Sequence, residues 1–457
     1  MATIIEQKPL YTQLPVGQEV IFVISNNIIV ANQLQVRFLA DVYISDTTPT
    51  AISTSSIPTA TFKTTPNNAG VGIFDFSQVV ENYVSADNMA ANQSKYKTTL
   101  TTDDTPHPLH LINQYSRNKK AARWLNIEFK TQYTDANGDV QIVSPKPSVD
   151  YRLFNGYLKY TDELSIFNND FGFDLGNFDL SSQTDRFLTN APATQYANLE
   201  DYGTLALLPS LAINSDLAHI KLKYFNSSNV QIGTEDVDKD FANGAYANIG
   251  SEISHRILYF GCFPANLQNW STTFNALVSP VDQMSGGSIV VQAFSNSGAI
   301  SKGYTININC PNLKGYESIR LCWLNQWGAW DYYTFTQKSI RSVSTKGSTY
   351  EQLAGTWNEA AYRVDSYKGG KKAFRVNATE KITMNTDFVS ESENEMFEEL
   401  INSPEVYILK GYQTDGAFSA LNQYVIPVRL TTSSFTKKTV ANDKLIQYTF
   451  EVEKSKT

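Results

Sequence analysis

The sequence predicts a mainly β protein of several domains, and three observations support this fold class. Tyr and Phe number 25 each, only 18% of the residues are charged, and short apolar runs alternate with turns rich in Asn, Gly and Ser. Aromatic and β-branched residues favour strands, and the apolar fraction of 42% is high enough for packed cores. We expect β-sandwich-like or β-barrel-like modules joined by long loops, with an α+β domain at the C-terminus.

The length and the order of the patterns predict three domains. At roughly 100–200 residues per domain, a chain of 457 residues holds about three of them. We predict an N-terminal β-rich domain at residues 1–150, a middle β-sandwich-like domain at 151–341 and a C-terminal α+β domain at 342–457.

The N-terminal block contains alternating apolar runs and one short helix. Ser77 is a residue type that caps helices, and a run with four apolar residues follows it up to Val84. Asn137 and Gly138 lie between two strand patterns, which is a strong signal for a β-hairpin. The expected strands are residues 20–24, 33–44, 73–76, 121–133 and 140–143.

The middle block repeats the hairpin pattern. In two further places an aromatic residue ends a strand, a small polar turn follows, and the chain resumes as a strand. Either duplication of a small sheet module or convergence on hairpin chemistry explains this similarity. Pro209 interrupts the apolar run 205–211, so we expect a short element there at best. The other expected strands are residues 220–225, 230–232, 251–262, 289–294 and 299–308.

The end of the middle block is the most aromatic part of the chain. Residues 319–335, IRLCWLNQWGAWDYYTF, contain three of the six tryptophans around a short Asn-Gln-Trp-Gly turn. Gly328 can adopt the positive φ that a tight turn requires. Aromatic side chains are favoured in a sheet core or at an interface. This hairpin therefore belongs to a core or a docking surface, and with one acidic residue and no histidine it suits assembly better than catalysis.

The C-terminal block predicts one helix packed on a sheet. Ser390 or Ser392 is a suitable cap, acidic residues occupy the first turn, and Pro404 ends the helix. The apolar face of this helix contains Met396, Phe397, Leu400 and Ile401. The expected strands are residues 406–409, 424–430 and 444–452.

Charge and composition argue against several classes of function. The net charge is −8 and the acidic residues are spread along the chain, whereas nucleic-acid binding requires a basic face. No window reaches the ~18 apolar residues of a membrane span, and the N-terminal sequence lacks the pattern of a signal peptide. The three cysteines match no zinc or redox spacing. We interpret them as small buried residues of a protein made in a reducing cytoplasm, with a disulfide left open.

No metal site or cofactor is predicted, because three candidate segments are better explained as ordinary loops. The segment 103–110 has two histidines and two aspartates between prolines, where a fixed ligand geometry is hard to obtain. Residues 135–139 begin like a calcium loop but lack its Gly and its bidentate Glu, so a hairpin turn is the better interpretation. In 168–180, aspartates alternate with phenylalanines that we expect to anchor the segment while the carboxylates face water.

No catalytic residue is predicted, and we expect no enzyme activity. The chain has no nucleophile elbow, Walker loop, dinucleotide fingerprint or His-Glu-x-x-His motif. Asp331 and Glu359, each near a tryptophan, are the pair to test for glycoside hydrolysis, because the separation of two carboxylates depends on the fold. Trp327, Trp330 and Trp357 are candidates for stacking on sugar rings, although such residues more often lie in a core or an interface.

Four segments that together span most of the chain are packing motifs rather than reactive ones. They are GIFDFSQVVENYV at 72–84, LFNGYLKY at 153–160, WLNQWGAWDYYTF at 323–335 and EMFEELINSPEVYIL at 395–409. In this order they resemble the β-rich virion proteins of tailed bacteriophages, especially those that infect Bacteroidetes. The resemblance implies a structural role in the tail, baseplate or neck, and the closing unit is similar to modules that build rings around the tail tube.

From this resemblance we expect a virion protein that is assembled in the host cytoplasm and present in several copies around a symmetry axis. The expected partners are other copies of the chain and neighbouring virion proteins, with no nucleic acid and no membrane. The Ser-, Thr- and Asn-rich stretches 45–70 and 85–108 are expected to be arms that order on assembly. The alternatives are a receptor- or carbohydrate-binding virion protein, with a host-surface glycan as partner, and a glycan-degrading enzyme.

Two groups of residues are expected to carry the binding and assembly role. One is the aromatic hairpin, and the other joins the C-terminal helix to its sheet. In order, they are Trp323, Trp327, Trp330, Tyr332 and Tyr333, and then Phe397, Leu400 and Tyr407.

Overall fold

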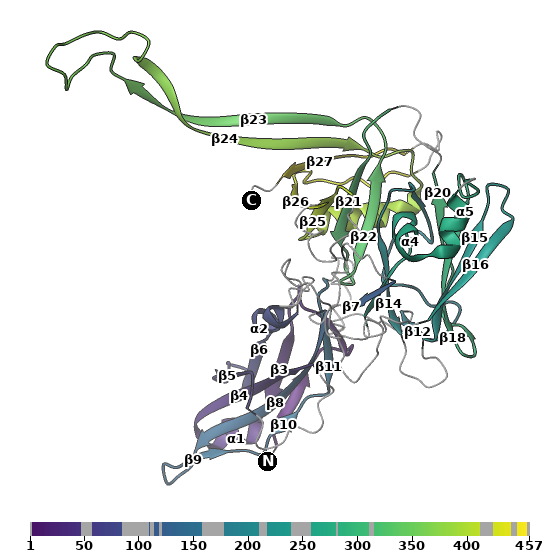
Figure 1. Cartoon of the computed structure of the whole chain (residues 1–457). Coiled ribbons are helices and arrows are strands. Elements are labelled where there is room, and N and C mark those ends of the chain that lie inside the picture. Colours follow the sequence, from purple (N-terminus) through teal and green to yellow (C-terminus); the bar gives the residue numbers. More distant parts are fainter. Residues whose placement is uncertain are drawn as a thin grey trace.

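The computed structural model is an elongated assembly of β-sheets with one long projecting hairpin (Figure 1). A narrow N-terminal body lies at one end, a larger body contains the middle and C-terminal sheets, and strands β23 and β24 extend away from it. The structure describes residues 2–46, 57–84, 109, 114–117, 121–157, 178–209, 217–238, 257–279, 282–309, 315–411, 424–439 and 446–454.

Two sheets enclose the N-terminal core. A three-stranded sheet packs on a seven-stranded sheet, and the fully buried rings of Phe22, Phe38, Phe129 and Tyr151 lie in the cluster they share. The small sheet has the order β1 (Ile4–Gln7), β3 (Ile21–Ser25), β6 (Val71–Asp75). The large sheet has the order β2 (Gln13–Pro15), β11 (Tyr151–Phe154), β8 (Ala122–Thr134), β4 (Leu34–Ser45), β5 (Ala60–Thr64), while β9 (Val140–Ile142) and β10 (Lys146–Pro147) also pair with β8.

The helix and the hairpin that the sequence predicted in the N-terminal body are both present, although the helix lacks the predicted cap. The predicted helix after residue 76 is present as α2 (Ser77–Val80) followed by the 3₁₀ turn η1 (Glu81–Tyr83), but no side chain caps it. A further short helix, α1 (Asn27–Asn32), is capped by the Asn26 side chain. The β8–β9 hairpin is confirmed: Gly138 has a φ of 89°, and the Asp135 carboxylate accepts two backbone N–H bonds across the turn.

Two sheets and two helices form the middle of the chain. A four-stranded sheet has the order β12 (Asp179–Leu180), β14 (Thr204–Pro209), β17 (Leu258–Gly261), β7 (Tyr115–Arg117). A six-stranded sheet has the order β13 (Thr194–Ala197), β20 (Tyr304–Ile308), β18 (Ser288–Ser295), β15 (His219–Phe225), β16 (Gln231–Asp238), with β19 (Gly298–Ala299) paired to β18. Helices α4 (Pro264–Trp270) and α5 (Thr272–Val278) contribute Leu267 and Phe274 to the core that the two sheets share.

The expectation for the run around Pro209 agrees with the structure. The apolar run 205–211 was expected to be a short element broken by Pro209, and β14 is a strand of six buried residues that ends at this proline. Pro209 is its last residue, and its neighbour β12 is short, so the missing N–H of proline interrupts little of the ladder.

The C-terminal block forms a sheet covered by one helix, as predicted, but this sheet has seven strands because it includes the aromatic hairpin, which we expected at the end of the middle domain. Its order is β22 (Trp330–Phe335), β21 (Ile319–Leu324), β25 (Val406–Leu409), β26 (Val425–Leu430), β27 (Thr449–Lys454), β24 (Gly370–Asn385), β23 (Ile340–Gln352). A capping box between Ser390 and Glu393 opens the turn η7 (Glu391–Glu393), and α6 (Asn394–Asn402) follows it. The aromatic hairpin β21–β22 is therefore part of the same sheet as the C-terminal strands.

The fold class predicted from the sequence is confirmed. The chain is mainly β, with several sheets and a C-terminal part that combines a sheet with a helix. In the described residues each of the five sheets has two end strands, so the modules are open sheets rather than closed barrels. No helix in the described part of the chain is long and apolar enough to cross a membrane.

Candidate functional site: the aromatic hairpin and the projecting arm

The aromatic hairpin is a core element of this chain. Trp323 is fully buried, and Trp327, the most exposed of the three tryptophans, is still only 8% exposed. Trp327 packs against Phe178 with ring centres 4.4 Å apart, and Trp330 lies edge-on to Tyr407 at 5.8 Å. The sequence allowed either a core or a docking surface for this hairpin, and in the structure its three tryptophans are core residues.

The two faces of the hairpin enter different cores. Trp323 packs in the cluster that contains Phe397 and Leu400 of α6, and Tyr333 packs beside it with its ring centre 5.0 Å from that of Phe397. Trp327, Trp330 and Tyr332 lie in a second cluster, on the side of β14 and β17. Because side chains alternate along a strand, one hairpin supplies both clusters.

Tyr407 does not pack the helix on its sheet as expected. Val406 and Ile408 of β25 point to the α6 side, whereas Tyr407 points to the opposite side and packs by Trp330. The two-residue period of a strand explains the difference, since neighbours in sequence lie on opposite faces. Phe397 and Leu400 hold the expected place between α6 and the sheet.

The two carboxylates proposed for glycoside hydrolysis do not share a site. Asp331 is buried in the body, where it accepts hydrogen bonds from the Thr189 hydroxyl (2.5 Å) and the Asn325 amide (3.1 Å). Glu359 lies in the segment that connects β23 (Ile340–Gln352) to β24 (Gly370–Asn385), and it pairs with Arg363 at 2.7 Å. Asp331 therefore serves a buried hydrogen-bond network, and Glu359 serves an exposed loop.

Metal and thiol chemistry find little support in the described residues. Within them, no three His, Cys, Asp or Glu side chains are placed to hold a metal ion. Of the candidate segments, residues 103–108, 110 and 168–177 lie outside the described residues, as does Cys310. Cys262 and Cys322 are buried free thiols, and burial raises the pKa of both far above its usual value, so they are unreactive packing residues.

The projecting hairpin, which we call the arm, is made of β23, β24 and the residues 353–369 that connect them. The two strands pair from Ile340 opposite Thr383 to Gln352 opposite Gly370, with one bulge near Ser348. Of the residues of β24, only Lys381–Asn385 pair with β27. Beyond that point the arm is a two-stranded ribbon that leaves the body, as Figure 1 shows.

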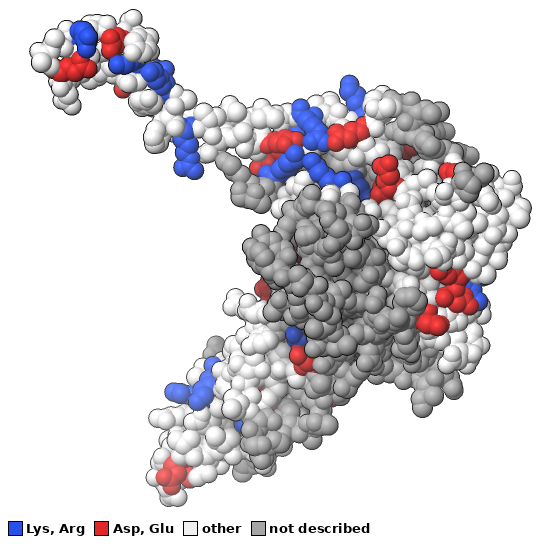
Figure 2. Space-filling model, viewed as in Figure 1, with Lys and Arg blue, Asp and Glu red and all other residues white. Residues whose placement is uncertain are grey.

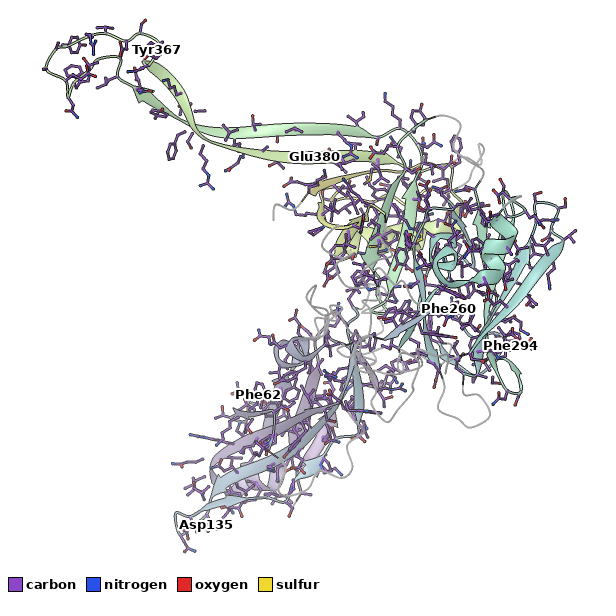
Figure 3. All side chains as sticks on the ribbon, in the orientation of Figure 1. Phe62, Asp135, Phe260, Phe294, Tyr367 and Glu380 are labelled. Atoms are coloured by element: carbon purple, nitrogen blue, oxygen red, sulfur yellow. The ribbon has the colours of Figure 1, made fainter. Side chains whose placement is uncertain are left out.

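The arm carries apolar side chains that the described part of the chain leaves uncovered. Met384 and Ile382 lie in the core, and the same two-residue period continues outward through Ala378 and Val376, which are exposed. Figure 3 shows Tyr367 at the far end, and this side chain is 77% exposed. The large apolar side chains exposed on the arm are Ile340, Val343, Tyr350, Leu353, Trp357, Tyr362, Val364, Tyr367, Phe374 and Val376.

Polar contacts fix the base of the arm. Glu380 of β24 binds Arg341 of β23 at 3.1 Å and also pairs with Lys454 of β27. The hydrogen bond from Lys454 is the main reason why the pKa of Glu380 is lowered. These contacts join three neighbouring strands at the position where the arm leaves the sheet.

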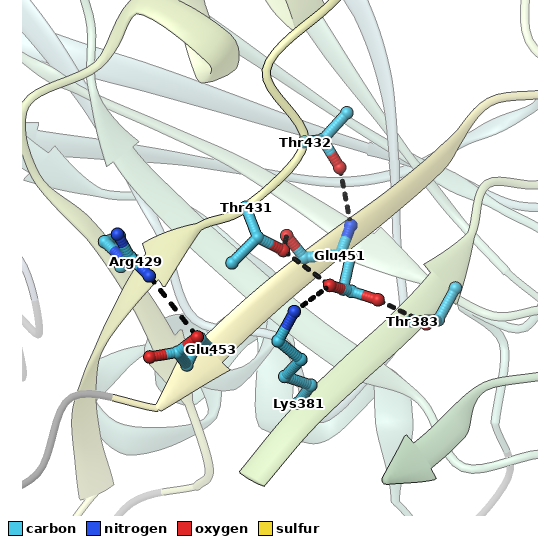
Figure 4. Close-up of polar contacts among 7 residues, drawn as sticks. All are labelled: Lys381, Thr383, Arg429, Thr431, Thr432, Glu451 and Glu453. Carbon is cyan, nitrogen blue, oxygen red and sulfur yellow. Dashed lines mark hydrogen bonds and ion pairs between the residues drawn. The ribbon is translucent and has the colours of Figure 1, made fainter. Parts of the chain in front are cut away.

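A second carboxylate strengthens this base (Figure 4). Glu451 of β27 accepts hydrogen bonds from Lys381 (2.9 Å) and from the Thr431 hydroxyl (2.8 Å). The hydrogen bond from Lys381 is the main cause of the lowered pKa of Glu451. These contacts thus hold the arm in a set direction at its base.

The arm is also basic, in contrast to the rest of the chain. Residues 343–379 contain six Lys and Arg and three Asp and Glu, which is a net charge of +3. Since the whole chain has a net charge of −8, the rest of the chain has a net charge of −11. Figure 2 shows basic side chains along the arm and at its base. Two of the three acidic residues are neutralised locally, Glu359 by Arg363 and Asp365 by Lys368.

Comparison with known proteins gives no family. No protein-family model and no curated protein match the chain. Extracellular domains 3–5 of Drosophila OTK align with 84% of this chain and 92% of that chain, at 9% identity and a TM-score of 0.18. Trypsin-activated alpha-2-macroglobulin from Escherichia coli aligns with 99% of this chain at 8% identity and a TM-score of 0.18, and this chain covers 29% of that structure. Likeness at this level carries no argument about function.

Proposed function

We propose that this protein is a structural subunit of a tailed-phage virion, in the tail, baseplate or neck, and that it acts by binding neighbouring proteins. The virion setting rests on the resemblance of the four packing segments. The binding role rests on one observation, the arm with its uncovered aromatic side chains.

The physical argument for binding starts from the stability of a hairpin. A two-stranded ribbon is marginally stable by itself in water, and exposed strand edges readily pair with other chains. This arm presents open edges and large apolar side chains on a support that is fixed at its base. Large exposed apolar patches mark interaction sites in soluble proteins. A partner that covers the arm would complete its packing.

The experiment is removal of the far end of the arm in an otherwise complete chain. Residues 353–369 are replaced by a two-residue Asn-Gly turn, which the flanking strands accept as a hairpin connection. Quantitative mass spectrometry of purified particles should then find the wild-type chain in several copies and the shortened chain strongly depleted. Equal melting temperatures of the two purified proteins would establish that the body still folds.

Two results would contradict the proposal. Normal incorporation of the shortened chain would remove the binding role of the arm. Absence of the wild-type chain from purified particles would remove the virion setting. A matched control is a change in another exposed hairpin, Val140→Ser, which should leave incorporation unchanged because it lies on β9 in the N-terminal body.

One observation favours a second candidate, a carbohydrate-binding role. Trp327 and Trp330 are buried, but Trp357 is 66% exposed and lies edge-on to the exposed Tyr362 at 5.2 Å. Exposed aromatic rings of this kind stack on sugars as well as on proteins. Binding to a host glycan array that is lost in Trp357→Ala would support this role over a purely structural one.

A further inference from the structure

We propose that the arm of one copy docks in a groove on the body of a second copy, which deepens the proposed function by naming the partner. The groove lies between β13, α6 and the β24–η7 connection, and we call it the β13–α6 groove. Its main lining residues are Thr194, Tyr196, Tyr333, Asp387, Phe388 and Glu393.

The groove has the size and surface to hold side chains of a hairpin. Its volume is about 640 Å³, within the ~300–1,000 Å³ of pockets that bury small molecules. Tyr196 and Phe388, both exposed, lie on its wall. The groove therefore offers an aromatic surface on which an aromatic side chain can pack, such as Phe374 of β24, which is 78% exposed.

One wall of the groove is an open strand edge. β13 is an end strand of its sheet and pairs only with β20 among the described strands. The carbonyls of Ala193 and Ala197 accept hydrogen bonds from Thr305 and Asn309 on the β20 side. The backbone N–H and C=O groups of neighbouring residues in a strand point to opposite edges, so those of Thr194 point away from β20. A further strand can pair there by β-augmentation.

The arm supplies the matching strand edge. β24 pairs with β27 only up to Lys381, so among the described strands its outer part from Gly370 to Glu380 has an open edge opposite β23. We assign the segment 370–376 as the strand that lies beside β13 of the second copy.

Charge favours a copy of the same chain over an arbitrary partner. Among the described residues, the groove is lined by two acidic residues, Asp387 and Glu393, and by no Lys or Arg. The segment assigned to it carries Lys371, Lys372 and Arg375. The arm has a net charge of +3 and the rest of the chain −11, so arm and body of two copies attract each other.

The arm cannot enter the groove of its own chain. Phe374 is eleven residues along β24 from Asn385, which at ~3.3 Å per residue is about 36 Å. The groove begins two residues after Asn385, and the arm leads away from it. Docking is therefore between molecules and joins two different surfaces, which builds rings or filaments rather than closed pairs.

Site-specific photocrosslinking tests the docking directly. The full chain carries benzoylphenylalanine in place of Phe374, and ¹⁵N-labelled and unlabelled copies are mixed before irradiation. Mass spectrometry should find crosslinks to peptides covering 192–196 or 387–396, and half of them should join labelled to unlabelled copies. The same photoreactive residue in place of the exposed Ile142 serves as control and should give no such crosslink.

Charge exchange provides the second test, with light scattering as the measurement. Lys371→Glu with Lys372→Glu in one variant, and Asp387→Lys in another, should each weaken self-association by about tenfold, which corresponds to ~1.4 kcal/mol. An equal mixture of the two variants should associate better than either alone, because an acidic arm then meets a less acidic groove.

The outcomes separate this inference from the proposed function. Crosslinks that reach neither groove peptide, or no recovery in the mixture, would overturn docking between copies. If the arm-shortened chain is still excluded from particles in that case, the structural role stands and the arm binds a different virion protein. Normal incorporation of the shortened chain would instead remove the binding role of the arm, and absence of the wild-type chain from particles would remove the structural role itself.

Discussion

Phe397→Ala and Phe374→Ala remove the same side chain from two very different places. Phe397 of α6 is fully buried, and its ring lies 5.0 Å from Tyr333 and 5.5 Å from Phe450. Phe374 of the arm is 78% exposed. If the arm stands clear of the body, the two substitutions should differ widely in their effect on stability.

The expected magnitudes follow from burial. A buried Phe→Ala change costs about 3–5 kcal/mol, because it loses transfer free energy and leaves a cavity. An exposed substitution usually changes the free energy of unfolding by less than about 0.5 kcal/mol. Since 1 kcal/mol shifts Tm by roughly 2–4 °C for 150–250 residues, Phe397→Ala should lower Tm by about 10 °C.

Differential scanning calorimetry of the three purified proteins, below the concentration of self-association, checks this expectation. The transition affected in Phe397→Ala should be unchanged in Phe374→Ala. An equal loss of Tm in both variants would refute the reasoning, because it would mean that Phe374 packs in a core and that the arm lies against the body.

Two further predictions concern the turn of the aromatic hairpin and the base of the arm. Gly328→Ala should destabilise more than Gly138→Ala in urea unfolding, because both have positive φ but only at Gly328 would a Cβ lie 2.5 Å from the Asn155 carbonyl oxygen; equal losses would contradict that close approach. Glu380→Gln should lower Tm at neutral pH. The hydrogen bond from Lys454 lowers the pKa of Glu380 in the folded protein, so its charge stabilises the fold above the ordinary pKa of about 4.5. The difference in Tm between the two proteins should therefore disappear as the pH falls from about 4.5 through that lowered pKa. A difference that persists when all carboxylates are protonated would exclude the charge of Glu380 as its cause.

The parts of the fold that the sequence predicted depend on local signals. The helix α6 follows a 3₁₀ turn that is capped by Ser390, it has an apolar face, and Pro404 lies just after its end; all three signals act within a few residues. The Asn137-Gly138 turn is equally local. Strand β25 was predicted with its observed bounds because turn residues flank four apolar residues.

The choice between core and surface for the tryptophan hairpin was not predictable in the same way. The strands β14 and β17, which lie beside Trp327 and Trp330, come from distant parts of the sequence. Aromatic content alone does not show which distant strand covers a given face. A buried Trp and a docking Trp therefore give the same local pattern.

The arm was missed for a related reason. Most residues of β23 are Ser, Thr, Lys or Gly, and neither strand shows the strong alternation of a half-buried strand. One signal was present: Phe374, Val376, Ala378, Ile382 and Met384 follow a two-residue period. The stretch 45–70, expected to be an arm, instead supplies β5 and part of the N-terminal sheet in its described portion.

A fixed base gives the arm an advantage in binding. Association is weakened when a segment must be ordered as it binds, and a hairpin clamped by Glu380 and Glu451 is ordered in advance. The same exposure creates a risk of unspecific strand pairing. The positive charges of Lys371 and Lys372 counteract that risk, because they disfavour the pairing of two arms side by side. An acidic groove is then the kind of surface that such an arm prefers.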